Sequence, residues 1–497
     1  MKLIPNVKSI EIKSGILKLG HICLGKNRLS ENAQKDFLSF CNKPQGEENI
    51  FFEDVQGLEN EEYEICVTQE KITVKSSSVS GEFYALQTLK QIFFQTDYNV
   101  PCLTIKDKPE FKIRGFMLDS GRYFFSVEDV KHFIRQMAMH KLNLFHFHLT
   151  EDQGWRVEIK KYPLLTQVGS VRKKTNFNHK PHGGFYTQEE IREIVSYAHD
   201  FCIKVMPEFD IPGHSRSAIA CYNDLTCFPR KLPVADHWGV KHDVLCVGKD
   251  STIEFVKNVL DEFFELFPDE YFHIGGDEVP KHRWNLCPHC QKRIKELGLK
   301  DSDDLQIWFM NLVKDYCKEH GKQSFMWSWD LKEEGSLDTD LGFTKCGELE
   351  TGERPFIDTS VEAYYIDLPY GYISLEKSAE HKPYNGNCLG VEATLWTEYV
   401  PDMKKAQKMT YPRLSAVSET GWCGESSWKD LKGKMDFYYK FLGENKLISA
   451  SLNQANPNKI RAFFSGLLFE RRQLAWEGLK NVFDDKYIEN IAKKDRS

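Results

Sequence analysis

The chain has 497 residues, of which 41% are hydrophobic and 28% are charged, and its formal net charge is −7. This mild acidity, with no basic stripe, excludes nucleic acid or an anionic membrane surface as the main partner. The length predicts two or three domains with a large core.

The first residues lack the uninterrupted apolar stretch of a secretory signal, because Pro5 and Lys8 break it. No apolar run along the chain is long enough to span a membrane. The 14 cysteines are scattered and form no compact disulfide framework. We therefore expect a cytoplasmic protein with reduced thiols.

Residues 1–107 predict a small α+β domain. Glu64–Thr68 and Lys71–Lys75 are β-rich, and Ser80–Thr96 places apolar residues at helical spacing. The polar, proline-containing segment Lys106–Pro109 predicts a linker to the next domain.

Residues 108–430 alternate short apolar runs, which end in polar residues, with helical stretches such as Val127–Met139, Gln188–Phe201 and Thr252–Phe267. Strands alternating with helices imply a parallel sheet, and eight units over this length favour a (β/α)8 TIM barrel. The residues after the strands would then build the active site. The expected strands are Ile113–Leu118, Leu142–Leu149, Lys204–Pro207, Tyr271–Ile274, Gln323–Trp327, Gly342–Lys345, Val361–Tyr365 and Leu389–Leu395.

Residues 431–497 are charged and predict a helical C-terminal extension that packs on the barrel. Its expected helices are Met435–Leu442, Lys459–Trp476 and Tyr487–Lys493. This extension is a candidate homodimer interface.

The sharpest motif is HIGGDE at residues 273–278. Two glycines let the backbone turn tightly at the strand end, so that Asp277 and Glu278 project near one site. Neighbouring carboxylates push their pKa values apart, so one acid can stay neutral as a proton donor while the other is ionised. The alternative is a solvated turn.

Three further polar segments follow predicted strands: RGFMLDSGR at 114–122, HFHLTEDQGW at 146–155 and PEFDIPGH at 207–214. The guanidinium fork of Arg114 suits two sugar hydroxyls, although an ion pair with Asp119 or Asp152 explains it equally well. His146 and His148 alternate along a strand, and we interpret them as core histidines rather than metal ligands.

Cys287 and Cys290 have the C-x2-C spacing of a metal knuckle. A zinc site would need two more ligands, for which Cys221, Cys227 and Cys246 are candidates on loops. Because half a site is weak support, we expect a loop stiffened by Pro288, with no metal and no cofactor.

Together the motifs resemble family twenty of the glycoside hydrolases, the β-N-acetylhexosaminidases. The resemblance runs from Arg114 to Trp422 and includes VEATLWTE at 391–398 and YYID at 364–367. It implies a retaining exo-hydrolase that removes terminal β-linked GlcNAc, with GalNAc as an alternative, from a small oligosaccharide or glycan.

The resemblance also implies roles for individual residues. Glu278 would be the general acid and base, Asp277 would orient the substrate's 2-acetamido group, and Tyr365 would bind the acetamido oxygen, which attacks the anomeric carbon. The remaining implied residues bind or enclose the sugar: Arg114, Asp152, His214, Trp329, Asp367, Trp396 and Glu398.

The chain departs from the family pattern where a further pocket tryptophan is expected, since residues 344–348 read TKCGE. Trp327 is a candidate substitute. Three alternatives stay open: an enzyme that releases a disaccharide or a sulfated sugar, a carbohydrate-binding protein on an inactive barrel, and a metal-dependent hydrolase. The presence of Asp277 and Glu278 disfavours the second, and a lone histidine at each strand end disfavours the third.

Overall fold

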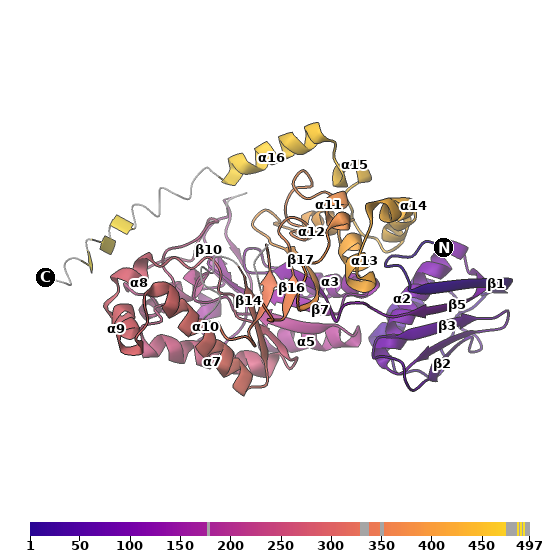
Figure 1. Ribbon diagram of the computed structural model, residues 1–497, viewed down its shortest axis with the longest axis horizontal. Helices are drawn as coiled ribbons and strands as arrows, with labels where there is room; N and C mark the ends of the chain where they lie inside the picture. Colours follow the sequence, from indigo (N-terminus) through magenta and orange to yellow (C-terminus); the bar gives the residue numbers. More distant parts are fainter. Residues whose placement is uncertain are drawn as a thin grey trace.

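The computed structural model describes residues 1–175, 179–328, 337–347, 352–473, 485–486, 488–489 and 491–492. Figure 1 shows a sheet domain at the N-terminal end of the molecule, a barrel beside it, and a helix, α16, that extends away from the barrel. In the part of the chain so described, no helix is both long and apolar enough to cross a membrane.

The N-terminal domain is a five-stranded sheet of order β1-β5-β3-β4-β2 with helices α1 (Glu31–Cys41) and α2 (Val79–Thr96). Ser78 caps α2 by accepting a hydrogen bond from the backbone N–H of Gly81, where a Cβ atom would lie 2.5 Å from the Glu62 carbonyl oxygen. The strands are β1 (Ser9–Lys18), β2 (Ile50–Asp54), β3 (Tyr63–Val67), β4 (Ile72–Ser76) and β5 (Asn99–Asp107).

Helix α2 joins the two domains. Its buried residues run without a break from Gly81 to Phe93, so the helix is covered on all sides. It packs on the sheet, while Phe83 contacts Phe201 and Tyr84 contacts Trp422 of the barrel domain. The predicted linker is likewise anchored, since the buried Asp107 pairs with Lys141 at 3.0 Å.

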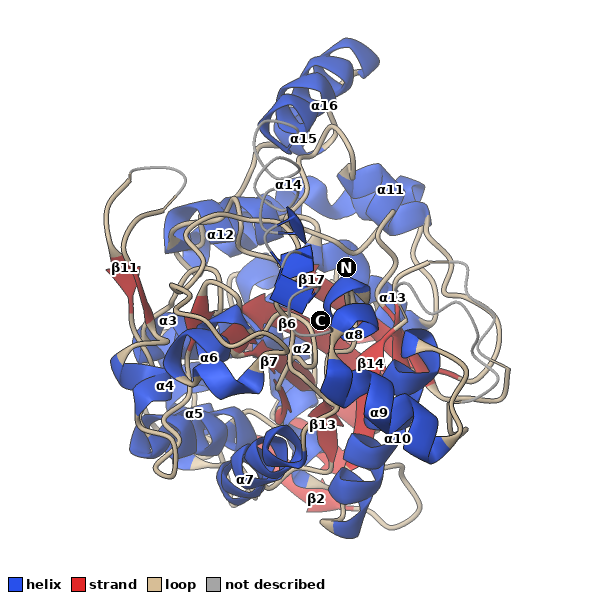
Figure 2. Cartoon of the chain, turned by 90° about the vertical axis from the view of Figure 1, so that its left-hand side faces the viewer, coloured by secondary structure: helices blue, strands red, loops and turns tan. Residues whose placement is uncertain are grey.

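Eight parallel strands close into a barrel in chain order, as the alternating sequence pattern predicts. Figure 2 shows helices around these strands. The strands are β6 (Ile113–Asp119), β7 (Leu144–His148), β12 (Lys204–Glu208), β13 (Tyr271–His273), β14 (Gln323–Trp327), β15 (Gly342–Lys345), β16 (Phe356–Asp358) and β17 (Cys388–Leu395). The main surrounding helices are α3 (Val127–Met139), α5 (Gln188–Asp200), α7 (Asp250–Leu266), α10 (Ser302–Glu319), α12 (Met403–Thr410) and α13 (Leu414–Cys423).

The predicted seventh strand is wrong. Val361–Tyr365 forms turns after β16, and only Tyr365 makes an isolated parallel bridge, to Thr394 of β17. The actual strand, Phe356–Asp358, is short and is preceded by Pro355. Val361–Tyr365 is the longer segment and has the stronger strand pattern in the sequence, although it lies after the end of the actual strand.

The barrel interior is layered. An apolar plug of Ile113, Leu144, Met206, Tyr271, Phe325 and Ile357 closes the end where the strands begin. A polar layer lies above it: the buried His146 pairs with Glu392 of β17 and Glu208 of β12, both at 3.1 Å. Such a packed interior directs function to the opposite end, where the strands finish.

After the barrel come α14 (Trp428–Glu444), α15 (Leu452–Ala455) and α16 (Lys459–Gln473). The first packs on α2 and α11 (Leu375–Glu380), whereas α16 exposes Ile460, Phe463 and Phe464. Of the third expected helix, Tyr487–Lys493, only scattered residues are described.

Candidate active site

The segments that follow the barrel strands converge on a cavity of about 260 Å³. Asp277 and Glu278 follow β13, His214 follows β12, and Arg122 follows β6. Because the C-terminal ends of parallel strands share one rim, residues far apart in sequence meet here. The cavity is lined by Arg122, His214, Asp277, Glu278, Trp327, Cys346, Val361, Tyr365, Asp367, Leu368, Trp396, Glu398 and Tyr399.

The turn that presents the two carboxylates depends on its glycines. Gly275 and Gly276 have φ values of +64° and +97°. A Cβ atom at Gly275 would lie 1.9 Å from an oxygen of Asp210, and one at Gly276 would lie 2.7 Å from the Met326 methyl group. Glycine is therefore needed both for the backbone conformation and for the close approach.

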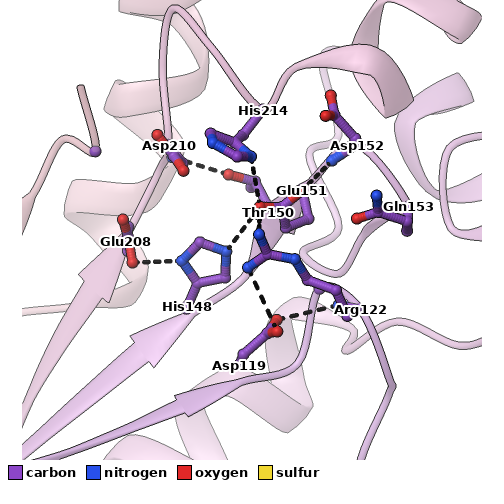
Figure 3. A network of polar contacts seen from close by, with 12 residues as sticks. Asp119, Arg122, His148, Thr150, Glu151, Asp152, Gln153, Glu208, Asp210 and His214 are labelled. Carbon is purple, nitrogen blue, oxygen red and sulfur yellow. Dashed lines mark hydrogen bonds and ion pairs between the residues drawn. The ribbon is translucent and has the colours of Figure 1, made fainter. Parts of the chain in front are cut away.

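A buried network lies beside this turn. Glu208 contacts His148 (Figure 3). His273 lies 3.1 Å from the same carboxylate, and Trp327 donates its indole N–H to it at 2.7 Å. Neighbouring strands thus bring their histidines together, so the expectation of a lone histidine at each strand end is wrong. Glu208 is the shared partner of these histidines, while Nε2 of His148 has no hydrogen-bond partner among the described residues.

A second group, Glu151, Arg122 and His214, forms the polar side of the cavity. Glu151 contacts Arg122 at 2.6 Å and His214 Nδ1 at 2.7 Å (Figure 3). Burial opposes ionisation of Glu151, but Arg122 and His214 outweigh it and hold its pKa well below the usual range. Glu151 therefore anchors two cations that face the cavity.

His214 links this anchor to the acid pair. Its Nε2 lies 3.8 Å from Asp277 Oδ2 and 3.6 Å from Glu278 Oε2. Burial alone would lower the pKa of His214, but Glu151, Asp210 and Asp277 raise it well above its usual value. The imidazole is thus held as a cation beside both carboxylates.

The environment suits Glu278 to proton donation. Burial, opposed by His214 and reinforced by Asp277, raises the pKa of Glu278 to about 7. Burial also raises the pKa of Asp277, again against the charge of His214. A carboxyl with a pKa near neutrality can both give and take a proton at moderate pH.

Aromatic side chains form another part of the lining, next to Arg122, whose guanidinium lies 4.9 Å from the Trp396 ring centroid. Trp327 and Trp396 pack with ring centroids 5.2 Å apart, and Tyr365 lies beside Trp396 at 6.3 Å. Among the described residues, the Trp396 indole nitrogen and one oxygen each of Asp367 and Asp277 are buried without a protein partner. A cavity lined by aromatic rings and by unsatisfied polar atoms fits a sugar.

Most of the predicted site residues come together. Asp277, Glu278, Tyr365, His214, Asp367, Trp396 and Glu398 all line the cavity. Asp152 lines an adjoining cavity of about 280 Å³ that shares Arg122, His214, Glu278 and Glu398. Trp329 lies outside the described residues.

The prediction that Arg114 binds sugar is wrong. Arg114 lies at the start of β6, the end of the barrel far from the cavity, and its side chain is fully buried. Its two terminal nitrogens contact the carboxylate of Glu61 at 2.9 and 3.0 Å, and its Nε donates to the Lys141 carbonyl. The residue therefore ties the barrel to the N-terminal domain.

We expect Glu61→Gln to lower the free energy of unfolding by about 3 kcal/mol, because it leaves the buried Arg114 guanidinium without its counter-charge. Urea unfolding measures the change. Glu59→Gln is the control, because its partner Lys108 is exposed, and it should cause no measurable change. Equal effects of the two substitutions would contradict a special role for the Arg114 pair.

Sequence reasoning did not single out Arg122 and Glu151, which line the cavities, or Asp210, which accepts a hydrogen bond from the Gly276 N–H at 3.3 Å. Arg122 lies in the same motif as Arg114, but after β6 rather than at its start. Position relative to the strand end is the signal that separates the two arginines. Trp327, considered as a substitute for the family's further tryptophan, does line the cavity, next to Cys346.

Known proteins share both domains. The catalytic domain of glycosyl hydrolase family 20 matches residues 111–377 and 359–425, and domain 2 of that family matches residues 1–108. A β-hexosaminidase of Porphyromonas gingivalis is 40% identical over 73% of this chain and 51% of its own length. One of Akkermansia muciniphila is 30% identical over 78% of this chain and 85% of its own length. The chain spans about half of the first of these relatives.

Solved structures of β-N-acetylhexosaminidases resemble this chain in fold. A β-N-acetylhexosaminidase from Bacteroides fragilis has a TM-score of 0.80 and 32% identity, over 92% of this chain and 99% of that one. An exo-β-N-acetylglucosaminidase from Vibrio harveyi, in complex with N-acetylglucosamine, has a TM-score of 0.79 and 27% identity, over 90% of this chain and 78% of that one. With the family match across both domains, these likenesses show that the chain belongs to glycosyl hydrolase family 20.

Proposed function

We propose that the chain is an exo-acting, retaining β-N-acetylhexosaminidase that removes terminal β-linked GlcNAc, and GalNAc as a second substrate, from oligosaccharides. The observation that carries this proposal is the acid pair: Glu278, with a pKa of about 7, stands beside Asp277 in a cavity with an aromatic wall. The N-acetylglucosamine in the Vibrio harveyi relative supports the choice of sugar.

In the proposed reaction the substrate supplies its own nucleophile. The acetamido oxygen attacks the anomeric carbon while Glu278 gives its proton to the departing glycosidic oxygen. Asp277 accepts a hydrogen bond from the acetamido N–H and stabilises the charge of the oxazolinium ring, and Tyr365 donates its hydroxyl to the acetamido oxygen. Glu278 then takes a proton from the water that opens the ring, so the anomeric configuration is retained.

The polar lining would bind the sugar hydroxyls. Arg122 and Glu398 lie 3.7 Å apart at the cavity, and Asp367 has a buried oxygen that no described protein group satisfies. Buried polar groups that only the correct hydroxyls can satisfy discriminate strongly between sugars. Trp327 and Trp396 would cover the apolar face.

Proton NMR during hydrolysis of an aryl β-N-acetylglucosaminide tests the mechanism. We expect the β-anomer of the free sugar to appear first, as retention requires. First appearance of the α-anomer would rule out substrate assistance. If the protein released sugar from neither the GlcNAc nor the GalNAc substrate, the proposed β-N-acetylhexosaminidase activity would be ruled out.

A reducing-end-labelled chitotriose tests exo action. We expect unlabelled monosaccharide as the first product, with a labelled disaccharide remaining. Release of an unlabelled disaccharide would instead support the alternative that the enzyme releases disaccharides.

The pH profile follows from the acid pair. The general acid must be protonated, so kcat/KM should fall as pH rises through about 7, the pKa of Glu278. Asp277 must be ionised, so activity should also fall at low pH, at values above those of an ordinary aspartate, because its pKa is raised. The measurement is kcat/KM against pH.

His214→Asn gives this assignment a direct check. Removing the imidazolium beside Glu278 should raise the pKa of that carboxyl and move the alkaline limb to higher pH. His199→Asn, at an ion pair with Asp269 on the outer surface, is the control and should leave the profile unchanged. An unmoved limb in His214→Asn would mean that another group controls it.

A further inference from the structure

Four cysteines from two separate segments of the chain meet outside the active site. Cys227, Cys246, Cys287 and Cys290 are all buried, and their sulfur atoms lie within 4.8 Å of one another. The separations are 3.8 Å for Cys227–Cys290, 3.6 Å for Cys246–Cys287 and 3.7 Å for Cys246–Cys290. A disulfide needs about 2.05 Å, so none of these pairs is bonded.

The separations match a metal tetrahedron. Four sulfurs at about 2.3 Å from a central zinc ion lie about 3.8 Å from one another. Cysteines that merely fill a core pack as independent small apolar groups and have no reason to take this spacing. Cys221, the other cysteine considered with this group, points elsewhere, since its thiol donates to the Leu164 and Ser217 carbonyls.

The backbone holds the four residues in place. Cys287 is the N-cap of α9 (Pro288–Leu297), and Cys290 lies in its first turn, so the start of this helix fixes the two residues relative to each other. Cys227 and Cys246 each follow a partner of the antiparallel bridge Thr226–Leu245.

The two segments are packed closely together. A Cβ atom at Gly248 would lie 2.3 Å from the backbone nitrogen of Cys290. Two cations bind carbonyls that flank the cluster: Lys249 contacts Thr226 at 2.9 Å, and Arg293 contacts Gly248 at 3.3 Å. They place positive charge near a group that would carry two net negative charges with zinc bound.

We propose that Cys227, Cys246, Cys287 and Cys290 bind one structural Zn²⁺ ion as four thiolates. Their four thiol protons leave to solvent as the metal binds, with no change in oxidation state. Because four protein ligands fill the tetrahedron, the ion takes no part in catalysis. This revises the sequence-based expectation of no metal.

The ion would act as a clamp on the active-site rim. One loop carries Trp238, Gly239 and Val240, which line the second cavity. The other segment continues directly from Glu278 through Trp284, whose indole N–H donates to the Leu245 carbonyl at 2.9 Å. Zinc would fix the position of one segment relative to the other.

Elemental analysis of the full chain, produced with zinc in the medium and purified without chelator, tests the proposal. We expect about one zinc per chain, and release of that zinc to a metal-sensitive dye when an organomercurial blocks the thiols. The double variant Cys287→Ser/Cys290→Ser should lose the metal. Cys317→Ser, at a buried cysteine of α10, is the matched control and should keep it.

Substitution with cobalt tests the site in the wild-type protein, so the result does not depend on whether a variant folds. Wild-type protein reconstituted with Co²⁺ should show the intense visible and charge-transfer bands of tetrahedral thiolate coordination. Zinc below background in the wild-type chain, stoichiometric iron instead of zinc, or disulfides among the four cysteines by mass spectrometry would each overturn the proposal.

Discussion

An aryl β-glucoside should be hydrolysed about 10⁵-fold more slowly, or worse, than the matching β-N-acetylglucosaminide. The two substrates differ only at carbon 2, where the glucoside has a hydroxyl in place of the acetamido group. A well-oriented internal nucleophile has an effective molarity of about 10⁵–10⁸ M, and the glucoside lacks it. The comparison uses kcat/KM values for substrates with the same leaving group.

Two controls sharpen this result. The β-N-acetylgalactosaminide keeps the nucleophile and changes only carbon 4. Its kcat/KM should therefore be much closer to that of the GlcNAc substrate than to that of the glucoside. A trifluoroacetamido substrate keeps the shape but weakens the nucleophile, and its rate should fall between those of the two extremes. Comparable rates for the glucoside and the acetamido sugar would overturn substrate assistance.

Glu278→Gln should lower kcat by about 10²–10⁴-fold on substrates with poor leaving groups, because the amide cannot donate the proton that the glycosidic oxygen needs. A dinitrophenyl leaving group departs without protonation, so the loss in the first step should largely vanish with that substrate. The measurement is kcat for the wild type and the variant across a series of aryl leaving groups.

The second half of the reaction tests the same residue as a base. Azide needs no proton removed, so it should restore turnover of the dinitrophenyl substrate by Glu278→Gln and give the β-glycosyl azide. Glu254→Gln, at an exposed position of α7, is the control and should behave as wild type. A variant that loses equal activity on every leaving group, without rescue, would point to a structural role for Glu278.

The barrel could be predicted from the sequence because its strands end in polar residues and alternate with well-capped helices. The helix at Val127–Met139, for example, has the predicted bounds, since Ser126 and Asp129 form a capping box at its start. The seventh strand could not be predicted, because Phe356–Asp358 is too short to show the alternation of side chains that identifies a strand. Its pairing with β15 and β17, rather than local preference, makes it a strand.

The acid pair could be predicted because its glycines and carboxylates are adjacent in sequence. Arg114 and Arg122 could not be told apart by residue type, since the difference between them is the length of one strand. The cysteine cluster likewise could be predicted only in part. Spacing identifies Cys287 and Cys290, whereas Cys227 and Cys246 join them only through the folding of a long loop. The domain boundaries, the cytoplasmic location and the homodimer stay predictions.

Helix α2 is buried without a break from Gly81 to Phe93, so the two domains that cover it depend on each other for stability. Each domain supplies part of the apolar cover of this one helix, and Arg114 adds a charge pair across the same contact. If the sheet opened, the helix would lose one wall and the barrel would expose the aromatic surface around Trp422 to water. We therefore expect the N-terminal domain and the barrel to unfold together as one cooperative unit.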